Sequence, residues 1–440
     1  MKKVLAVFLA LVMLLGVSAC AGSPTTGTND AEQPSTGADQ SASMGAENNA
    51  NKSTTEITYV TLGDTGLEKL KEAAAVFEQE TGIKVNFESW SYSDAYSKIL
   101  TLAEAGNMPD AMYGFSSWTE QFKEAGYTVE IGQYISEELY NDFTESAREV
   151  CSVNGELWAM PSYMSVRSVI INKDAFASAG LPVPTTWEEM LADCAALCDD
   201  GYCQYAYTMV AGHAKNTADC FLPILWAYGA DVLSEDQKSV AFNTPEGVAA
   251  LQMYVDLAKY SVPDYGEALI ANTLANFGSQ IAAAHLANSQ AMANLKAEGK
   301  DYSFAQIIEP LKGPGGEAYS YGVMDVDLIF KTGNEEAAGQ WLEFWHQTEY
   351  MGKVFEEFGF IPNQKSFYEE NPSFSDPAND LVAPFAAMVE QAKFKPTITC
   401  WEEIQKIFSD YVAKAVLGQM TAEEAFAAAE TECNAVLAAQ

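Results

Sequence analysis

From residue 56 onward, the pattern of apolar and polar residues alternates between the periods of strands and helices. Residues 57–60 predict a strand, residues 63–66 a turn and residues 85–88 a second strand. Between the strands, apolar residues recur at helical spacing at Leu67, Leu70, Ala74 and Phe77. A strand–helix–strand unit of this length predicts parallel pairing and an α/β layer architecture.

The same alternation continues to the C-terminus. It predicts strands at 111–113, 169–171 and 323–330, and helices at 118–125, at 335–347 and over about the last 40 residues. Two helix starts carry caps: Thr186 with Glu189 predicts a capping box, and Thr244 precedes a proline at the first helical position. The helix after Thr244 is expected to bury a stripe made of Val248, Leu251, Val255 and Ala258.

Residues 1–19 have the features of a signal peptide. Lys2 and Lys3 precede an apolar run over 4–15, and small residues stand before Cys20. The run is too short to span a membrane, which takes about 20 apolar residues. Small residues before a cysteine resemble the bacterial lipobox, which implies lipid on Cys20 and anchoring to the extracytoplasmic face of the cell membrane. An ordinary signal peptide is the alternative, and the polar segment 20–55 predicts a flexible tether.

Charge and motifs exclude several functions. The chain has 61 acidic and 24 basic residues and a formal charge of -37, which argues against nucleic acid or an anionic lipid surface as partner. The roughly 385 residues after the tether are enough for two or three domains. The sequence contains no nucleophile-elbow, zinc-protease or phosphate-loop motif. We therefore expect neither catalysis nor a cofactor.

Seven cysteines remain beyond Cys20, and an odd number leaves at least one of them unpaired. Cys194, Cys198, Cys203 and Cys220 lie near one another in sequence, but their spacing does not fit a zinc site. Buried free thiols are expected, with a local disulfide among these four as the alternative.

Five segments in sequence order resemble motifs of the maltose-binding type of bacterial extracellular solute-binding proteins, the substrate-binding lipoproteins of ABC transporters. They are 108–111, 154–161, 170–176 with 184–189, 229–231 with 242–247, and 336–344. The resemblance implies an α/β, type II periplasmic-binding-protein fold, in which crossing strands join two lobes around a ligand cleft. It places crossings near 162–168, 321–327 and 358–362, an N-terminal lobe at 56–165 plus 323–360, and a C-terminal lobe at 166–322 plus 361–440.

The resemblance also implies a function. It is that of a monomeric receptor of an ABC importer, which captures a carbohydrate by hinged lobe closure and delivers it to a membrane permease. The same fold binding a polyamine, another amine, a metal complex or a peptide is the alternative, since acidic and aromatic residues also suit a cation. A surface glycosidase that uses two carboxylates, or an adhesin or signalling role, is less favoured.

Sugar sites use aromatic faces for stacking and carboxylate or amide groups for hydrogen bonds. Ligands in open α/β sheets bind beyond the C-terminal ends of strands. In the first lobe this position selects Asp64, Trp90, Tyr92 and Trp118. In the second lobe and the crossings the candidates are Tyr163, Arg167, Asp219, Trp226, Asn288, Asp325 and Trp401. Asp64 and Trp401 match ligand-contacting positions of the family.

Several candidates have a structural alternative. Asp64 fits a turn or helix cap equally well, Trp118 the first buried turn of a helix, and Trp401 burial under the C-terminal helix. Arg167 either binds an acidic group of the ligand or pairs with an aspartate such as Asp325. Asp325 and Asp327 alternate along one strand, so both are expected to reach the cleft. Gly114 and Ala291 are small where maltose binders place larger or polar contacts, so the particular sugar is not indicated.

Overall fold

A computed structural model describes residues 55–212, 214–374, 376, 379 and 382–439. The predicted signal peptide, the lipid anchor at Cys20 and the tether up to residue 54 lie outside the described residues. The division of the two lobes by residue number stays a prediction.

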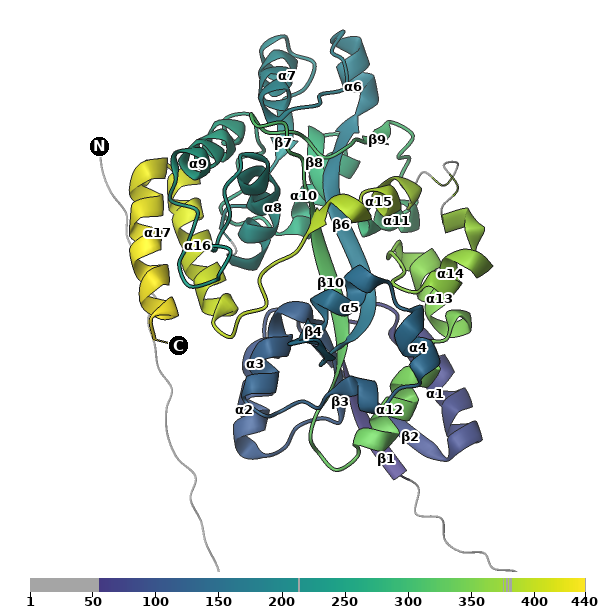
Figure 1. The fold of residues 1–440 in the computed structure, drawn as a ribbon. Helices are drawn as coiled ribbons and strands as arrows, with labels where there is room; N and C mark the ends of the chain where they lie inside the picture. Colours follow the sequence, from purple (N-terminus) through teal and green to yellow (C-terminus); the bar gives the residue numbers. More distant parts are fainter. Residues whose placement is uncertain (1–54, 213, 375, 377–378, 380–381, 440) are drawn as a thin grey trace, which may run out of the picture. The chain divides into compact units, whose positions relative to one another are not determined.

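One mixed sheet runs through both lobes, in the strand order β2-β1-β3-β10-β6-β8-β7, with β11 beside β10 and β9 beside β6 (Figure 1). As predicted, β1 and β2 pair in parallel, whereas β10 is antiparallel to β3 and β6 and parallel to the short β11. The strands of this sheet are β1 (Thr55–Leu62), β2 (Ile83–Trp90), β3 (Ala111–Phe115), β6 (Met160–Asn172), β7 (Tyr205–Thr208), β8 (Ala282–Asn288), β9 (Ala305–Ile307), β10 (Ser320–Ile329) and β11 (Ala392–Lys393). A separate pair is formed by β4 (Ser152–Val153) and β5 (Glu156–Leu157).

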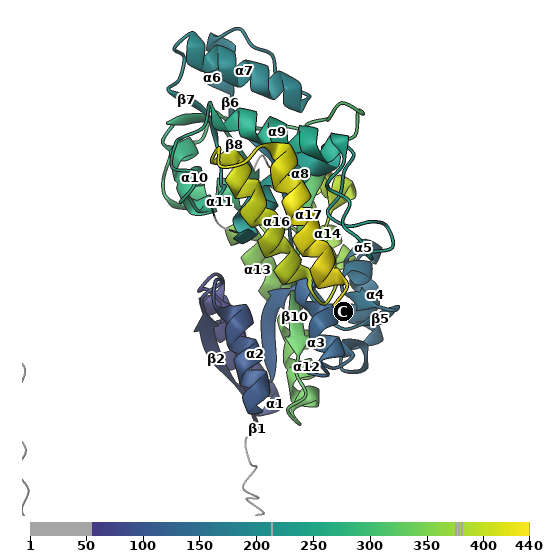
Figure 2. The same ribbon diagram turned by 90° about the vertical axis from the view of Figure 1, so that its left-hand side faces the viewer.

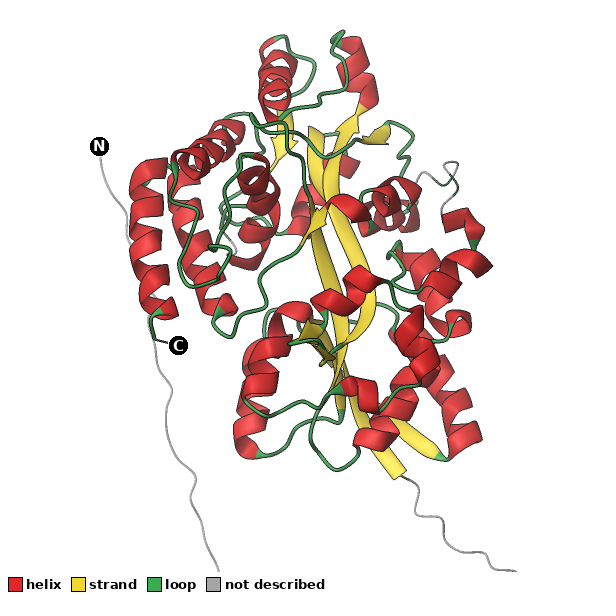
Figure 3. Ribbon diagram, viewed as in Figure 1, coloured by secondary structure: helices red, strands yellow, loops and turns green. Residues whose placement is uncertain are grey.

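Helices flank the sheet in both lobes (Figure 3). In the first half of the chain they are α1 (Leu67–Thr81), α2 (Ala95–Ala105), α3 (Thr119–Glu124), α4 (Glu137–Asp142), α5 (Glu145–Val150), α6 (Lys173–Ser178), α7 (Trp187–Asp199) and α8 (Ala214–Ala227), with short 3-10 turns at Ser116–Trp118 and Ile131–Gln133. Later helices are α9 (Pro245–Ala258), α10 (Ile270–Gly278), α11 (Gln290–Ala297), α12 (Glu335–Trp345), α13 (Thr348–Phe358), α14 (Lys365–Glu370), α15 (Ala383–Ala387), α16 (Trp401–Val416) and α17 (Ala422–Leu437), with 3-10 turns at Pro372–Phe374 and Val389–Gln391.

The predicted helix starts are present, with one correction. Thr186 accepts a hydrogen bond from the Glu189 amide, but the Glu189 carboxylate bonds to the amide and hydroxyl of Thr185 instead of closing a capping box on Thr186. Thr244 caps α9 as predicted. The buried face of α9 is wider than the predicted stripe, because Ala250, Met253, Tyr254 and Leu257 are also buried, while Val248 and Val255 are only partly buried.

Each lobe has its own aromatic-rich core. In the first, α1 and α12 pack on β1 and β2, and Trp341 contacts Tyr59 and Phe77 edge to face. In the second, α8, α9, α16 and α17 pack together, with the rings of Phe221, Phe408 and Phe426 in mutual contact; Figure 2 shows α16 and α17 along the outside of this lobe. Among the described helices, none combines the length and the apolar character needed to cross a bilayer.

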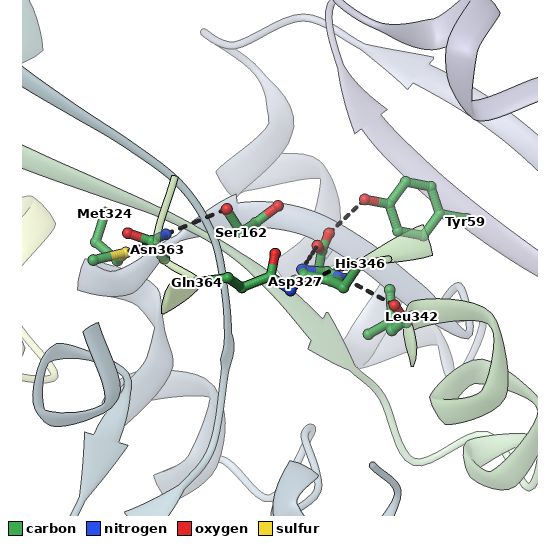
Figure 4. Close-up of polar contacts among 8 residues, drawn as sticks. All are labelled: Tyr59, Ser162, Met324, Asp327, Leu342, His346, Asn363 and Gln364. Atoms are coloured by element: carbon green, nitrogen blue, oxygen red, sulfur yellow. Dashed lines mark hydrogen bonds and ion pairs between the residues drawn. The ribbon is translucent and has the colours of Figure 1, made fainter. Parts of the chain in front are cut away.

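The crossing segments meet in a buried polar network at the base of the first lobe (Figure 4). The Asn363 amide donates to the Ser162 carbonyl at 3.3 Å, which joins the third crossing to β6. On β10, the Asp327 carboxylate accepts a hydrogen bond from the Tyr59 hydroxyl and lies 3.5 Å from Nε2 of His346. Asp327 is fully buried. In this structure it does not reach the cleft: β3 pairs in unbroken register with both aspartates, but Tyr59 and His346 enclose the Asp327 carboxylate within the first-lobe core.

The seven cysteines of the described region are free thiols. Five are buried, and Cys198 and Cys203 are partly exposed. Among the residues the structure describes, no cluster of three or more His, Cys, Asp or Glu side chains could hold a metal ion.

Candidate ligand-binding site

Asp219 is the centre of a buried ionic cluster on the side of α8 that faces the crossing strands. Its carboxylate accepts from Lys395 Nζ at 2.7 Å and from the Tyr321 hydroxyl at 2.9 Å, and it lies 3.4 Å from Nη2 of Arg167. Burial by itself raises the pKa of Asp219, but Lys395, Arg167 and Lys215 outweigh burial and hold the pKa at about 2. Asp219 is therefore a fixed negative charge at neutral pH.

Two contacts join the lobes beside this cluster. From the second lobe, Lys215 at the start of α8 places Nζ 3.3 Å from the ring centroid of Phe115, the last residue of β3. Glu402 at the start of α16 accepts from Trp118 Nε1 at 3.2 Å and from the Ser117 hydroxyl at 3.5 Å. The lobes thus meet through a cation on an aromatic face and through a carboxylate with two neutral donors.

Asp325 of β10 lies at the junction, bonded by Tyr113 of the first lobe and near Lys215 of the second. It is 5% exposed, and burial raises its pKa to about 7 against the opposing effects of a hydrogen bond from Tyr113 and the charges of Lys215 and Arg167. Within the described part of the chain, its Oδ1 atom has no hydrogen-bond partner. An unpaired buried carboxylate oxygen is costly. It is thus an available acceptor at the junction of the lobes.

Aromatic rings line the first-lobe side of the junction. They surround a cavity of about 10 Å³, whose lining includes Tyr59, Tyr92, Tyr113, Tyr163 and Phe360. Tyr163 stacks on Phe360 with centroids 4.5 Å apart, while Tyr92 is 47% exposed. Gly63 permits the position of Tyr92, because a Cβ at this left-handed residue would lie only 3.0 Å from the Tyr92 ring.

Two further cavities adjoin the ionic cluster. One of about 30 Å³ is lined by residues that include Phe115, Lys215, Tyr321 and Glu402. Another of about 690 Å³ is lined by residues that include Glu149 and Val150 of α5, Asp231 and the segment 394–397. Phe394 and Lys395 line both. The cavities of about 10 and 30 Å³ are far smaller than a small-molecule site, which is roughly 300–1,000 Å³, so the faces that line them must separate before a sugar-sized ligand can lie there.

The structure gathers six of the predicted residues at this junction and places a seventh beside them. The six are Tyr92, Trp118, Tyr163, Arg167, Asp219 and Asp325. Asn288 pairs with Arg167 across β8 and β6. Arg167 has the structural ion pair that was one of its two predicted roles, with Asp219 as the partner in place of Asp325.

The other four predicted residues do not line the junction cavities, although the ring of Trp226 lies against that of Tyr321 with centroids 6.1 Å apart. Asp64 is exposed and accepts from the Ser89 hydroxyl at 2.8 Å, and Trp90 packs under Lys98 while donating to Glu88. Trp226 and Trp401 are 2% and 1% exposed, respectively, and belong to the core of the second lobe. Trp401 thus occupies the buried position that was its structural alternative.

The predictions missed the residues that complete the junction: Tyr113, Lys215, Tyr321, Phe394, Lys395 and Glu402. Lys215 and Lys395 could have been noticed because basic residues are scarce in this chain, at 24 against 61 acidic ones. Tyr113 and Tyr321 lie inside strands and read as core residues. The small residue at position 114 has a local explanation, because a Cβ there would lie 3.0 Å from the Trp118 ring.

Comparison with known proteins identifies the family. The sequence profile described as "Bacterial extracellular solute-binding protein" matches residues 63–351. The chain belongs to this family. A binding protein of Brucella abortus is 28% identical over 377 residues, which cover 83% of this chain and 89% of that protein.

Solved structures of solute-binding proteins have the same fold. The maltose-bound T. maritima MalE3 superposes with a TM-score of 0.78 and 21% identity, covering 87% of this chain and all of that one. An ABC transporter solute-binding protein of Thermotoga lettingae bound with α-D-tagatose gives a TM-score of 0.76 and 23% identity over 87% and 100% of the two chains. These likenesses confirm the two-lobed α/β fold of an extracellular solute-binding protein.

Proposed function

We propose that this solute-binding protein is the receptor of an ABC importer, which captures a carbohydrate between its lobes and delivers it to a membrane permease. The observation that carries the proposal is the junction itself, where aromatic rings from the first lobe face buried ionic groups of the second. Tyr92, Tyr113 and Phe115 supply faces for the C–H surface of a sugar ring, and Asp325 supplies an unpaired acceptor for hydroxyl groups. Structural neighbours with bound maltose and tagatose support this class of ligand.

Capture would proceed by hinged closure. The inner cavities of about 10 and 30 Å³ are too small for a sugar residue. The crossing strands β6 and β10 connect the lobes (Figure 1), and the contacts of Lys215 with Phe115 and of Glu402 with Trp118 are the ones that opening would break. A ligand then favours the closed form to the extent that it contacts both lobes better than they contact each other.

The location of the receptor is part of the proposal. Lipid on Cys20 would hold it, as a monomer, on the extracytoplasmic face of the membrane, with residues 20–55 as a tether long enough to reach the permease. A Cys20→Ala variant should leave the membrane fraction and appear in the soluble extracytoplasmic fraction. A variant that stays on the membrane would contradict lipid anchoring.

An amine cargo is the second candidate, favoured by Asp325 beside two tyrosines. The junction also contains Lys215 and Lys395, whose charges would repel an amine, and this favours the sugar.

Thermal unfolding of the chain from residue 21 onward, which retains every described residue, distinguishes a carbohydrate ligand from an amine. It is measured with mono- and oligosaccharides, uronic acids, polyamines and amino acids. A ligand at ~100 times its Kd should stabilise the protein by about 2.7 kcal/mol. Stabilisation by amines alone would contradict the carbohydrate proposal.

A further inference from the structure

The lobe junction concentrates positive charge in a strongly acidic protein. The chain has only two arginines among 24 basic residues, and one of them, Arg167, lies here together with Lys215 and Lys395. Arg167 is 6% exposed, and its Nε and Nη1 atoms have no hydrogen-bond partner in the described region. A protein with a formal charge of -37 gains nothing in solubility from buried cations, so their position needs another explanation.

The carboxylates at the junction do not balance these cations. Asp219 is shared by Arg167 and Lys395, and Glu402 is occupied by Trp118 and Ser117. No carboxylate of the described residues lies within ion-pair distance of Lys215. Its Nζ atom instead lies over the Phe115 ring, 3.3 Å from the centroid. Arg167, Lys215 and Lys395 therefore face Asp219, Glu402 and Asp325. Burial raises the pKa of Asp325 to about 7, so this carboxyl is only partly ionised near neutral pH, and burial with the charge of Lys395 lowers the pKa of Lys215 to about 8.

The position of Lys215 suits a ligand of particular chemistry. Its side chain lines the cavity of about 30 Å³ together with Phe115, Tyr321, Lys395 and Glu402, whose carboxylate already accepts from Trp118 and Ser117. A sugar ring stacked on Phe115 would place its exocyclic group next to the lysine. Closing the lobes on a neutral sugar would leave the cation desolvated without an ionic partner, which is costly, whereas a carboxylate on the sugar would provide one.

We propose that the physiological ligand is an acidic saccharide, whose carboxylate binds Lys215 while its ring stacks on Phe115. This inference rests on the proposed carbohydrate function and narrows it to a uronic-acid-containing sugar. One lysine without an ionic partner matches one carboxylate better than a phosphate monoester, which carries roughly -1.5 to -2 at pH 7. Arg167 pairs with Asp219, which also binds Lys395, and does not line the cavity.

Isothermal titration of the chain from residue 21 onward tests this inference. The probes are galacturonate, digalacturonate and glucuronate, their neutral counterparts galactose, digalactose and glucose, and glucose 6-phosphate. We expect at least one uronate to bind about tenfold or more tightly than its neutral counterpart, as a charged hydrogen bond provides. Lys215→Met should remove this preference, and Lys215→Arg should retain it. Lys406→Met, which changes an exposed lysine of α16 in the same way, should leave it intact.

The outcomes distinguish failure of the acidic-ligand proposal from failure of the carbohydrate-receptor proposal. Neutral sugars that bind as tightly as uronates, or a preference for uronates that survives both Lys215→Met and Lys215→Gln, would overturn the acidic ligand while leaving the carbohydrate receptor in place. Tighter binding of glucose 6-phosphate than of any uronate would also overturn it. Stabilisation by polyamines or amino acids in the thermal-unfolding series, with no saccharide bound in either experiment, would overturn both.

Discussion

Asp325 and Asp327 stand two residues apart on β10, and their different surroundings show how one strand serves two regions. Both are buried, and burial raises the pKa of each to about 7. Asp327 is enclosed by Tyr59 and His346, which belong to the core of the first lobe (Figure 4). Asp325 is bonded by Tyr113 of the first lobe and feels the charge of Lys215 from the second.

The surroundings of Asp325 and Asp327 distinguish groups that stabilise the fold from groups that act in ligand binding. Asp327, Tyr59 and His346 all lie within the first lobe, so we expect their contacts to persist when the lobes separate and their energy to contribute to folding. Asp325 has its Tyr113 partner within the first lobe, but Lys215 comes from the second, so the interaction of Asp325 with Lys215 depends on the approach of the lobes and contributes to closure and ligand binding. Trp401 and Trp118 repeat the contrast, since Trp401 is buried inside the second lobe while Trp118 reaches across to Glu402. Burial alone therefore does not tell a functional residue from a structural one.

The largest effect is expected from Trp401→Ala. Because the indole is 1% exposed in the second core, its removal should lower the free energy of unfolding by about 3–5 kcal/mol, the usual cost of a large-to-small core change. Urea denaturation measures this loss, and titration of the folded protein should find ligand affinity nearly unchanged. A stable variant with weakened binding would instead place Trp401 in the ligand site.

The next effect is a pH dependence at Asp327. Its folded pKa of about 7 exceeds the unfolded value of about 3.9, so the unfolded chain ionises first and the protein loses stability as pH rises between these values. Asp327→Asn lacks this titration, and its stability relative to the wild type should increase by on the order of 2–3 kcal/mol from pH 5 to pH 8.

Urea denaturation of both proteins across this pH range gives the difference directly. His346, whose pKa burial lowers to about 4, destabilises the protein as pH falls below its unfolded value, but it is present in both proteins and largely cancels in the comparison. A difference that stays constant with pH would show that Asp327 is already ionised in the folded state.

The sequence predicts the features that depend on local stretches of chain better than those that depend on packing between distant segments. Periodicity and caps located β1, α1, α9 and α12 because each depends on a short stretch of chain. The partner of Arg167 could not be chosen, since Asp219 is 52 residues away and meets it only through the packing of α8 on the crossing strands. The core position of Trp401 was likewise undecidable from its neighbours, because the second core is assembled from segments between residues 169 and 433.

A smaller effect is expected from Tyr92→Ala on the ligand side of the comparison. The ring is 47% exposed and lies at the edge of the aromatic cavity, so its loss should cost little stability. If it stacks on a sugar, affinity should fall by on the order of 1 kcal/mol, or about fivefold. Phe115→Leu makes a useful companion, because it removes the aromatic face under Lys215 but keeps an apolar side chain. Unchanged affinity in both variants would exclude stacking on this wall.

The smallest effect should come from Glu402→Gln, and its direction depends on the ligand. Glutamine can still accept from Trp118 Nε1, but a neutral acceptor is weaker than a carboxylate, so closure should lose less than about 1 kcal/mol and neutral sugars should bind slightly less well. The same change removes a negative charge near Lys215, which leaves that cation with less compensation. The ratio of uronate affinity to neutral-sugar affinity should therefore rise a few-fold. If the ratio falls or stays constant in paired titrations, Glu402 acts only as a contact between the lobes, and the charge at the junction does not select the ligand.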